Sequence, residues 1–196
     1  MWIGAAGAYL LLIGFFLIER LVRAHETLDM TRQSTDRGST TFVSTAMAVA
    51  LVLIPLTPLL NWWGIGTTPV AVSGSLVATS LIGTVIGLIG LMERYQAFKY
   101  LGQSFTRTLQ APPERRLVTT GSYRYVRHPG YLANLLIFLG ASIAMNNLIT
   151  VFIVAAAFIS AYVYRIKVEE AMLVEVFGDE YRDYQKRSKR LIPWVW

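Results

Sequence analysis

Long apolar stretches alternate with short charged segments along this chain. The apolar stretches cover residues 2–18, 42–63, 70–92 and 130–164, and none of them contains a charged side chain. An α-helix rises about 1.5 Å per residue, so crossing a hydrocarbon core of ~30 Å takes about 20 apolar residues. The stretches 42–63 and 70–92 have this length, and 2–18 reaches it with one more turn. The pattern therefore predicts membrane-spanning helices.

The last apolar stretch, 130–164, is too long for one span and short for two. Asn146 and Asn147 lie at its middle, and we interpret the stretch as a tight hairpin of two helices that turns there. This gives five spans in total. Within 70–92, four small residues share one face of the predicted helix, which favours close helix packing.

The charged residues are confined to three segments, 19–37, 93–127 and 165–190, which hold four, seven and seven of the eighteen lysine and arginine residues. Basic residues gather on the cytoplasmic side of membrane proteins. We therefore expect these segments in the cytoplasm and the N-terminus outside. The net charge of +6 then suits an anionic inner leaflet. Neither a nucleic-acid partner nor a cleaved signal peptide is expected.

Composition restricts the chemistry further. The chain has no cysteine and only two histidines, so we expect no disulfide, no cysteine nucleophile and no metal site. Strand-like alternation of apolar and polar residues is absent, which argues against a hidden dinucleotide-binding domain. Any cofactor must therefore be bound by loops and helix ends at the charged side.

The segment 96–127 is the candidate for such a loop, because a proline pair and a glycine interrupt helix formation there. The expected fold is all-α and integral to the membrane, with five transmembrane helices, a cytoplasmic cofactor-binding loop and C-terminal helices. We expect residues 1–196 to form a single membrane domain, in which 1–92 supplies three spans and 93–196 the catalytic region.

The C-terminal segment is predicted to divide at Gly178, which ends a helix that continues from the last span. Asp179 is then expected to cap a second, short helix that carries Tyr181 and Tyr184 on one side. This helix has two interpretations. It lies on the membrane surface as an amphipathic helix, or it forms a lid over a cytoplasmic site.

Three short motifs lie on the charged side. LVTTGSY covers residues 117–123, RHPGY covers 127–131, and RIKVEE covers 165–170. The predicted hairpin joins the last two motifs, so they are expected to be neighbours in space although they are far apart in sequence. This cluster is where we expect the function to lie.

The run LVTTGSYRYVRHPGYLAN, followed after the hairpin by RIKVEEAMLVEVFGDEYRDYQKRSKRLIP, resembles the isoprenylcysteine carboxyl methyltransferase family. It is also similar to the wider group of small membrane methyltransferases that includes phospholipid N-methyltransferases. The resemblance extends from about Leu101 to Pro193, and its RHPxY, EE and FGxEYxxY elements are specific in combination. It implies S-adenosyl-L-methionine as methyl donor and a lipid-like acceptor.

The resemblance also implies roles for individual residues. Arg165, four residues before the first glutamate of the EE pair, is implied to contact the substrate, and we treat it as the catalytic candidate. The residues implied to contact the cofactor are Gln110, Arg115, Arg116, Leu117, Val118, Tyr123, His128, Pro129, Gly130, Tyr131 and Glu169.

The chemistry of these residues fits the donor, which carries a sulfonium, an ammonium, a carboxylate and an adenine. Glu169 can pair with a cationic group, while His128 and the tyrosines can bond to adenine or stack on it. Pro129 suits a first helical turn, where free main-chain N–H groups attract an anion. A carboxylate acceptor has a reference pKa of about 4 and needs no general base. Orientation by Arg165 would then suffice.

Several of these residues also have a simpler alternative role. His128 can simply cap a helix. Arg165 can extend to a lipid phosphate at the end of its helix. Glu169 and Glu170 can be solvated surface charges, and Glu169 can pair with Arg165 one turn away.

For the whole chain, we expect a methyltransferase that acts on the carboxylate of a prenylated cysteine. The acceptor enters from the bilayer and the donor from the cytoplasm. The alternative enzyme is a phospholipid amine N-methyltransferase, which needs a base such as Glu170 or His128. A non-catalytic lipid-binding or transport protein is a third class, although spans without charge argue against transport.

Overall fold

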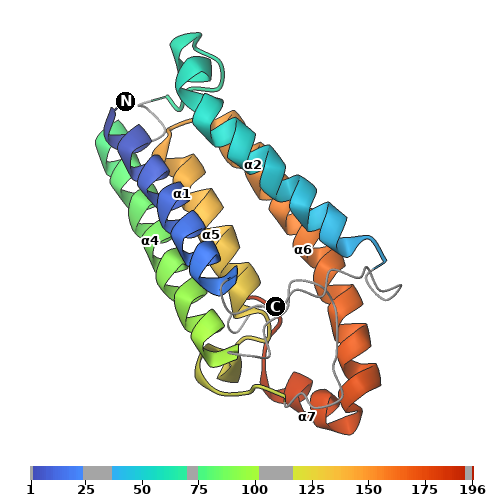
Figure 1. Ribbon diagram of the computed structural model, residues 1–196. Coiled ribbons are helices and arrows are strands. Elements are labelled where there is room, and N and C mark those ends of the chain that lie inside the picture. The colour runs from blue at the N-terminus through green and yellow to red at the C-terminus, as the bar shows by residue number, and fades with distance from the viewer. Residues whose placement is uncertain (1, 24–36, 70–74, 102–116, 193–195) are drawn as a thin grey trace.

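The computed structural model describes residues 2–23, 37–69, 75–101, 117–192 and 196 of the chain. The regular elements among these residues are all helical (Figure 1). They are α1 (Trp2–Arg23), α2 (Ser39–Trp62), α4 (Leu76–Leu101), the 3₁₀ turn η3 (Gly121–Arg124), α5 (Pro129–Ala144), α6 (Leu148–Phe177) and α7 (Asp179–Arg187).

Four of the described helices, α1, α2, α4 and α6, are long and apolar enough to cross a membrane. This confirms the predicted all-helical fold class with several candidate spans. The predicted number of five is not established, because α5 is apolar but only 16 residues long. At about 1.5 Å per residue it extends only about 24 Å. The third span also differs from its prediction, since α4 runs nine residues past Met92 to Leu101.

The predicted helical hairpin is confirmed. Helix α5 ends at Ala144 and α6 begins at Leu148, so the turn lies at Asn146 and Asn147. Asn146 adopts a left-handed conformation with φ of 54°, which asparagine tolerates better than most residues. Asn147 caps α6, because its side chain accepts a hydrogen bond from the Thr150 N–H at 2.9 Å.

Side chains of this turn also tie the neighbouring helices together. The Asn147 amide donates to Asn61 Oδ1 of α2 at 2.7 Å, and the Asn146 amide donates to Ser80 Oγ of α4 at 2.7 Å. The sequence indicated the turn but not this network, because its partners come from distant helices.

Helix α5 occupies the centre of the bundle. In Figure 1, α1, α4 and α5 lie side by side, and α2 runs along α6. Close packing of the small-residue face of α4 was predicted, and the structure shows α5 as the partner of Gly83 and Gly90. A Cβ atom on Gly83 would lie 2.4 Å from the Ala144 nitrogen, and one on Gly140 would lie 2.5 Å from the Gly83 oxygen. The backbones approach so closely that only glycine fits.

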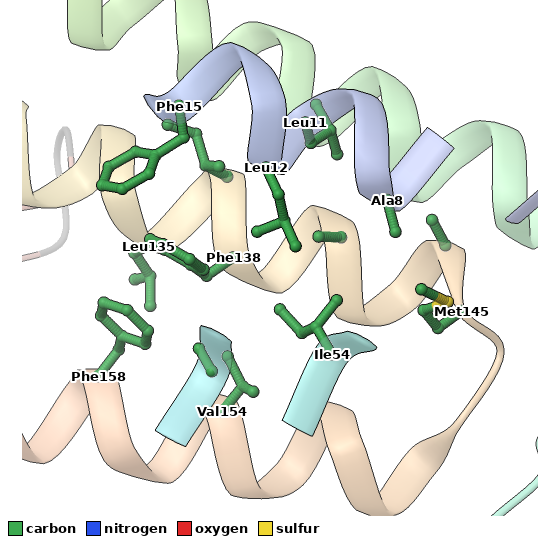
Figure 2. Packing of buried hydrophobic residues seen from close by; sticks show 14 of the residues in the cluster. Ala8, Leu11, Leu12, Phe15, Ile54, Leu135, Phe138, Met145, Val154 and Phe158 are labelled. Atoms are coloured by element: carbon green, nitrogen blue, oxygen red, sulfur yellow. The ribbon is translucent and has the colours of Figure 1, made fainter. Parts of the chain in front are cut away.

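The hydrophobic core is formed by buried residues of α1, α2, α5 and α6. Helix α4 borders it through Leu91. Figure 2 shows Phe15 of α1, Ile54 of α2, Phe138 of α5 and Phe158 of α6 converging in this core. The core holds α5 against α6. It therefore also holds the polar residues that lie on these two facing sides, nearer the N-terminus of α5.

The C-terminal region divides at Gly178, as predicted. Helix α6 continues without a break to Phe177, and Gly178 has a positive φ of 55°. The expected cap was wrong: Gly178 holds the cap position of α7, and Asp179 is the first helical residue. The Asp179 carboxylate instead pairs with Arg182 at 2.7 Å. Negative charge in a first turn is favoured by the helix dipole.

A candidate active site between α5 and α6

Helix α5 begins directly after the RH pair of the RHPGY motif. Pro129 is its first residue, which confirms the prediction for a proline whose fixed φ and missing N–H suit that position. His128 holds the cap position and is buried, with 5% of its surface exposed. The motif therefore places a histidine at the entrance of a buried helix.

Tyr131 lies at the centre of the site. Its hydroxyl donates to Glu169 Oε2 at 2.5 Å and accepts from Arg165 Nε at 3.1 Å. Its ring stacks on His128, with centroids 5.5 Å apart and planes at 10°, and on Tyr162, at 4.8 Å and 18°. One phenol thus links a carboxylate to a guanidinium while two aromatic neighbours hold its ring in place.

Arg165 is buried, with 4% of its surface exposed. Its Nη1 donates to Ser39 Oγ and to Thr40 Oγ1 in the first turn of α2, at 2.8 Å each. A side chain so enclosed does not reach a lipid phosphate, so the snorkelling alternative is wrong. The described contacts place the guanidinium between α2, α5 and α6.

Glu169 is the more accessible carboxylate of the EE pair. Its side chain is 23% exposed, and its Oε2 lies 3.7 Å from His128 Nδ1. The Tyr131 hydroxyl connects Glu169 to Arg165, the partner that the alternative role of Glu169 suggested. Burial, followed by the charge of Glu169, raises the pKa of the Tyr123 phenol well above its usual value. Tyr123 is therefore a neutral group close to the carboxylate.

Glu170 is not a solvated surface charge. Its side chain is 5% exposed, and its two oxygens accept from Arg127 Nε at 2.7 Å and from Arg190 Nε at 2.9 Å. His128 Nε2 lies 3.5 Å from the same carboxylate. Two guanidinium partners stabilise the ionised form, which makes this carboxylate a poor base.

The C-terminal segment contacts η3 and the residue that precedes α5. The Tyr184 hydroxyl of α7 donates to the Tyr123 carbonyl at 2.5 Å, and the main-chain N–H of His128 donates to the Arg190 carbonyl at 3.1 Å. Burial raises the pKa of Tyr184 to about 12, so the phenol remains a neutral donor. These contacts favour the lid interpretation over a helix that lies free on the membrane.

The remaining predicted cofactor residues are more scattered. Leu117 and Val118 are half-buried and lead into η3. Gly130 is half-buried and sits against Arg94, whose Nη2 pairs with Glu19 at 2.6 Å. The predicted residues Gln110, Arg115 and Arg116 lie outside the described part of the chain.

Pro129 also borders a cavity on the other side of α5 from Tyr131. It lines a cavity of about 560 Å³ between α4, η3 and α5. Tyr131 and Glu169 are not among the described residues that line this cavity. Pro129 thus lies at the border between that cavity and the cluster around Tyr131.

Sequence reasoning assigned no role to several residues in or beside the site, namely Ser39, Thr40, Arg127, Asn134, Tyr162 and Arg190. Helical spacing gave a usable signal for two of them. On α5, residues 128, 131 and 134 share a face, and on α6 residues 162, 165 and 169 share the facing one. Ser39 and Thr40 carried no such signal, because their approach depends on how α2 packs on α6.

Comparison with known proteins supports the resemblance. Residues 81–175 match the Isoprenylcysteine carboxyl methyltransferase (ICMT) family. The chain is 32% identical over 123 residues to a protein-S-isoprenylcysteine O-methyltransferase of Schizosaccharomyces pombe, which covers 62% of this chain and 51% of that protein. It is 38% identical over 84 residues to methanethiol S-methyltransferase 1 of Bradyrhizobium diazoefficiens. This match covers 42% of this chain and 27% of that protein.

The fold is also shared with a solved structure. The eukaryotic intramembrane Ras methyltransferase ICMT aligns with a TM-score of 0.61 and 24% identity, over 92% of this chain and 61% of that one. This likeness concerns the fold and supports an integral membrane protein. The chain spans about half the length of the S. pombe relative. Residues 81–175, which match the isoprenylcysteine carboxyl methyltransferase family, contain His128, Tyr131, Arg165 and Glu169.

Proposed function

We propose that the chain is a membrane-embedded methyltransferase that uses S-adenosyl-L-methionine and methylates the carboxylate of a prenylated cysteine. The observation that carries this proposal is the buried Arg165, joined to Glu169 through the Tyr131 hydroxyl. An anion-binding group and a cation-binding group are thereby held a short, fixed distance apart. This is the arrangement that an anionic acceptor and a cationic donor require.

The residues present fit the methyl donor. Glu169 offers a partly exposed carboxylate for a cation, and His128 Nδ1 lies 3.7 Å away as a second polar partner. The N-terminus of α5 offers the positive end of a helix dipole to a carboxylate. Stacking on Tyr131 fixes the His128 imidazole in this position. When bound, S-adenosyl-L-methionine supplies an electrophilic methyl group on a sulfonium sulfur.

The role of the protein is then to bind and orient. Arg165 holds an acceptor carboxylate by charge-assisted hydrogen bonds, and Tyr131 fixes the guanidinium that does so. A carboxylate is ionised at neutral pH, so its oxygen attacks without prior proton removal. Burial of the site keeps water from competing for the guanidinium. Orientation alone can supply several kcal/mol, up to about 7–11 kcal/mol in favourable cases.

The contacts of Glu170 weigh against the amine alternative. An ammonium acceptor must lose a proton, and Glu170 is engaged by Arg127 and Arg190. The buried guanidinium of Arg165 would in addition repel a cationic acceptor. A carboxylate acceptor meets none of these obstacles.

We further propose that α5 acts as the fifth span and that the three basic segments lie in the cytoplasm. Arg165 and Glu169 then lie at the cytoplasmic edge of the bilayer, because they follow the apolar part of α6. A lipid-like acceptor enters from the bilayer, and the donor enters from the cytoplasm. The positive-inside bias of the sequence supports this orientation.

Transfer of a labelled methyl group tests the proposal. The purified full chain is incubated with methyl-labelled S-adenosyl-L-methionine and, separately, with N-acetyl-S-farnesylcysteine, phosphatidylethanolamine or a small thiol. We expect label in the farnesylcysteine product, released as methanol by mild base because the product is a methyl ester. Base-stable label in phosphatidylethanolamine would support the amine alternative. Transfer to the thiol alone would contradict a carboxylate acceptor.

A further inference from the structure

The cavity of about 560 Å³ between α4, η3 and α5 has no part in the site around Tyr131. Its volume lies within the range of ~300–1,000 Å³ that is typical of small-molecule sites. The described residues that line it come from α4, α5 and the segment before α5, and none of them belongs to α6. Arg165 and Glu169 are therefore not part of its wall, and the cavity is a candidate site for a second ligand.

The wall of this cavity is apolar at one end and polar at the other. The apolar end has Ile89 of α4 with Leu132 and Leu136 of α5, and the polar end has Glu93 and Gln96 of α4 with Ser122 and Arg124 of η3. The apolar residues belong to the uncharged stretches 70–92 and 130–164, whereas the polar ones belong to the charged segment 93–127. The cavity therefore crosses the boundary between the hydrocarbon region and the charged side of the bundle.

The charges at the polar end are not used by the described part of the fold. Glu93 and Gln96 are half-buried, and neither side chain has a hydrogen bond or an ion pair with a described residue. The described contact of the Arg124 guanidinium is with the neighbouring Tyr125 ring, 5.8 Å from its centroid. One carboxylate and one guanidinium thus face the same cavity, and each is available to a ligand of opposite charge.

Packing of η3 on α4 builds this polar end. The Tyr100 ring of α4 lies directly against Gly121, where a Cβ atom would collide with it. Gly121 also has a positive φ of 60°, a conformation that glycine adopts readily. This close contact holds η3 against the end of α4, and it brings Arg124 to the same cavity as Glu93.

We propose that the cavity binds one phospholipid of the surrounding bilayer, with an ethanolamine head group. Glu93 accepts hydrogen bonds from the ammonium of the head group, and Arg124 donates to its phosphate. The aliphatic end of the cavity covers the upper part of an acyl chain, while the rest of the lipid stays in the bilayer. This lipid is not the methyl acceptor, because α5 separates the cavity from Arg165.

The charges of the cavity distinguish this lipid from other phospholipids. Phosphatidylglycerol has a phosphate for Arg124 but no cation for Glu93. Phosphatidylcholine has a cation, but its quaternary ammonium carries no N–H that could donate to the carboxylate. A water-soluble zwitterion would match both charges and leave the aliphatic end of the cavity unfilled. The competing explanation is a groove filled by water and by exchanging lipids without preference.

Native mass spectrometry of the purified full chain in detergent separates these explanations. Dioleoyl phosphatidylethanolamine, phosphatidylcholine and phosphatidylglycerol are titrated separately. For the wild type we expect one saturable site, with a Kd for phosphatidylethanolamine about tenfold lower than for the other two lipids. The preference arises because only this head group makes charge-assisted hydrogen bonds to Glu93.

Three variants test the wall of the cavity. Glu93→Gln should raise the Kd for phosphatidylethanolamine about tenfold and remove its preference over phosphatidylcholine. Arg124→Gln should weaken all three lipids, because they share the phosphate. Leu136→Trp fills the apolar end and should abolish the saturable site. Glu175→Gln is the matched control for Glu93→Gln, since Glu175 is exposed on α6, and it should leave all three Kd values unchanged.

Arg165→Ala separates the cavity from the acceptor site and should leave lipid binding unchanged. Loss of the phosphatidylethanolamine site in this variant would place the lipid at the acceptor site and overturn the inference. Equal wild-type Kd values for the three lipids would also overturn it, as would binding without saturation or unchanged binding in Leu136→Trp. If a cavity variant shows no cooperative thermal unfolding, the wild-type preference decides.

Discussion

The Tyr131 hydroxyl is both donor and acceptor, and this double role explains the geometry of the site. It donates a hydrogen bond to Glu169 and accepts one from Arg165. A phenylalanine would keep the stacking on His128 and Tyr162 but would leave two buried or half-buried charges without their common partner. Residues of the RHPGY and RIKVEE motifs thus act as one unit.

Glu169 should govern the affinity for the donor. We expect Glu169→Gln to weaken binding of S-adenosyl-L-methionine at least tenfold, because a charge-assisted hydrogen bond contributes about 1.5–3 kcal/mol. Titration calorimetry measures this directly. Glu175→Gln is the matched control, since Glu175 lies on the same helix and is exposed. Unchanged affinity in Glu169→Gln would remove this residue from the donor site.

Glu170 should govern stability. Removing its charge leaves the Nε groups of Arg127 and Arg190 without an anionic acceptor, and breaking a buried pair costs up to about 3–5 kcal/mol. The cost is smaller here because Arg190 is 38% exposed. We expect Glu170→Gln to lower the midpoint of thermal unfolding and to make the C-terminal segment more sensitive to trypsin.

Asp183→Asn is the control for that experiment. It removes the ion pair between Asp183 and Lys186, whose side chains are 69% and 77% exposed, respectively. Such exposed pairs contribute little to stability. Equal thermal midpoints for Glu170→Gln and the wild type would show that the Glu170 contacts do not stabilise the fold.

The residues that the sequence identified are those with a motif behind them. His128, Tyr131, Arg165 and Glu169 were predicted at one site, and the structure brings them together. Glu170 was left open between surface charge and base because its second partner, Arg190, approaches only after the chain folds back beyond α7. Sequence spacing carries no information on such a return.

At the scale of elements, the close contact of α4 and α5 positions the start of α5. Both helices present glycines at the contact, so their axes approach without intervening side chains. The apolar periodicity was sufficient to predict these helices and the hairpin. It did not predict where α4 begins or that α4 continues to Leu101, because helix ends depend on turns and caps.

Gly83→Ala should disrupt this contact. Its new methyl group would lie 2.4 Å from the Ala144 nitrogen and 2.6 Å from the Gly140 oxygen, which are main-chain atoms that cannot rotate away. We expect a loss of about 1–3 kcal/mol, seen as a lower midpoint of thermal unfolding in detergent.

Gly14→Ala provides the comparison, because its nearest neighbour is the Leu91 side chain, which can rotate. It should be neutral or stabilising, since alanine favours helix by about 1 kcal/mol over glycine. Similar midpoints for the two variants would contradict direct backbone packing of α4 on α5.

At the scale of the molecule, the helices form a bundle whose charged residues gather toward one end. Reporter tags inserted after residues 35 and 110, or fused after residue 196, should indicate the cytoplasm. A tag at residue 66, in the connection after α2, should indicate the outside. This expectation follows from the distribution of basic residues, because that connection contains no lysine or arginine. A cytoplasmic signal at residue 66 would refute the five-span arrangement.

The most direct test of the central claim is the turnover of Arg165→Ala, measured together with its affinity for S-adenosyl-L-methionine. Arg165 positions an acceptor carboxylate in this account, so its loss should reduce methyl transfer by orders of magnitude, while donor affinity stays within a fewfold of the wild type. Arg165→Lys should recover only part of the turnover, because an ammonium lacks the planar fork. Near-wild-type turnover in an Arg165→Ala protein that still binds the donor would contradict the account.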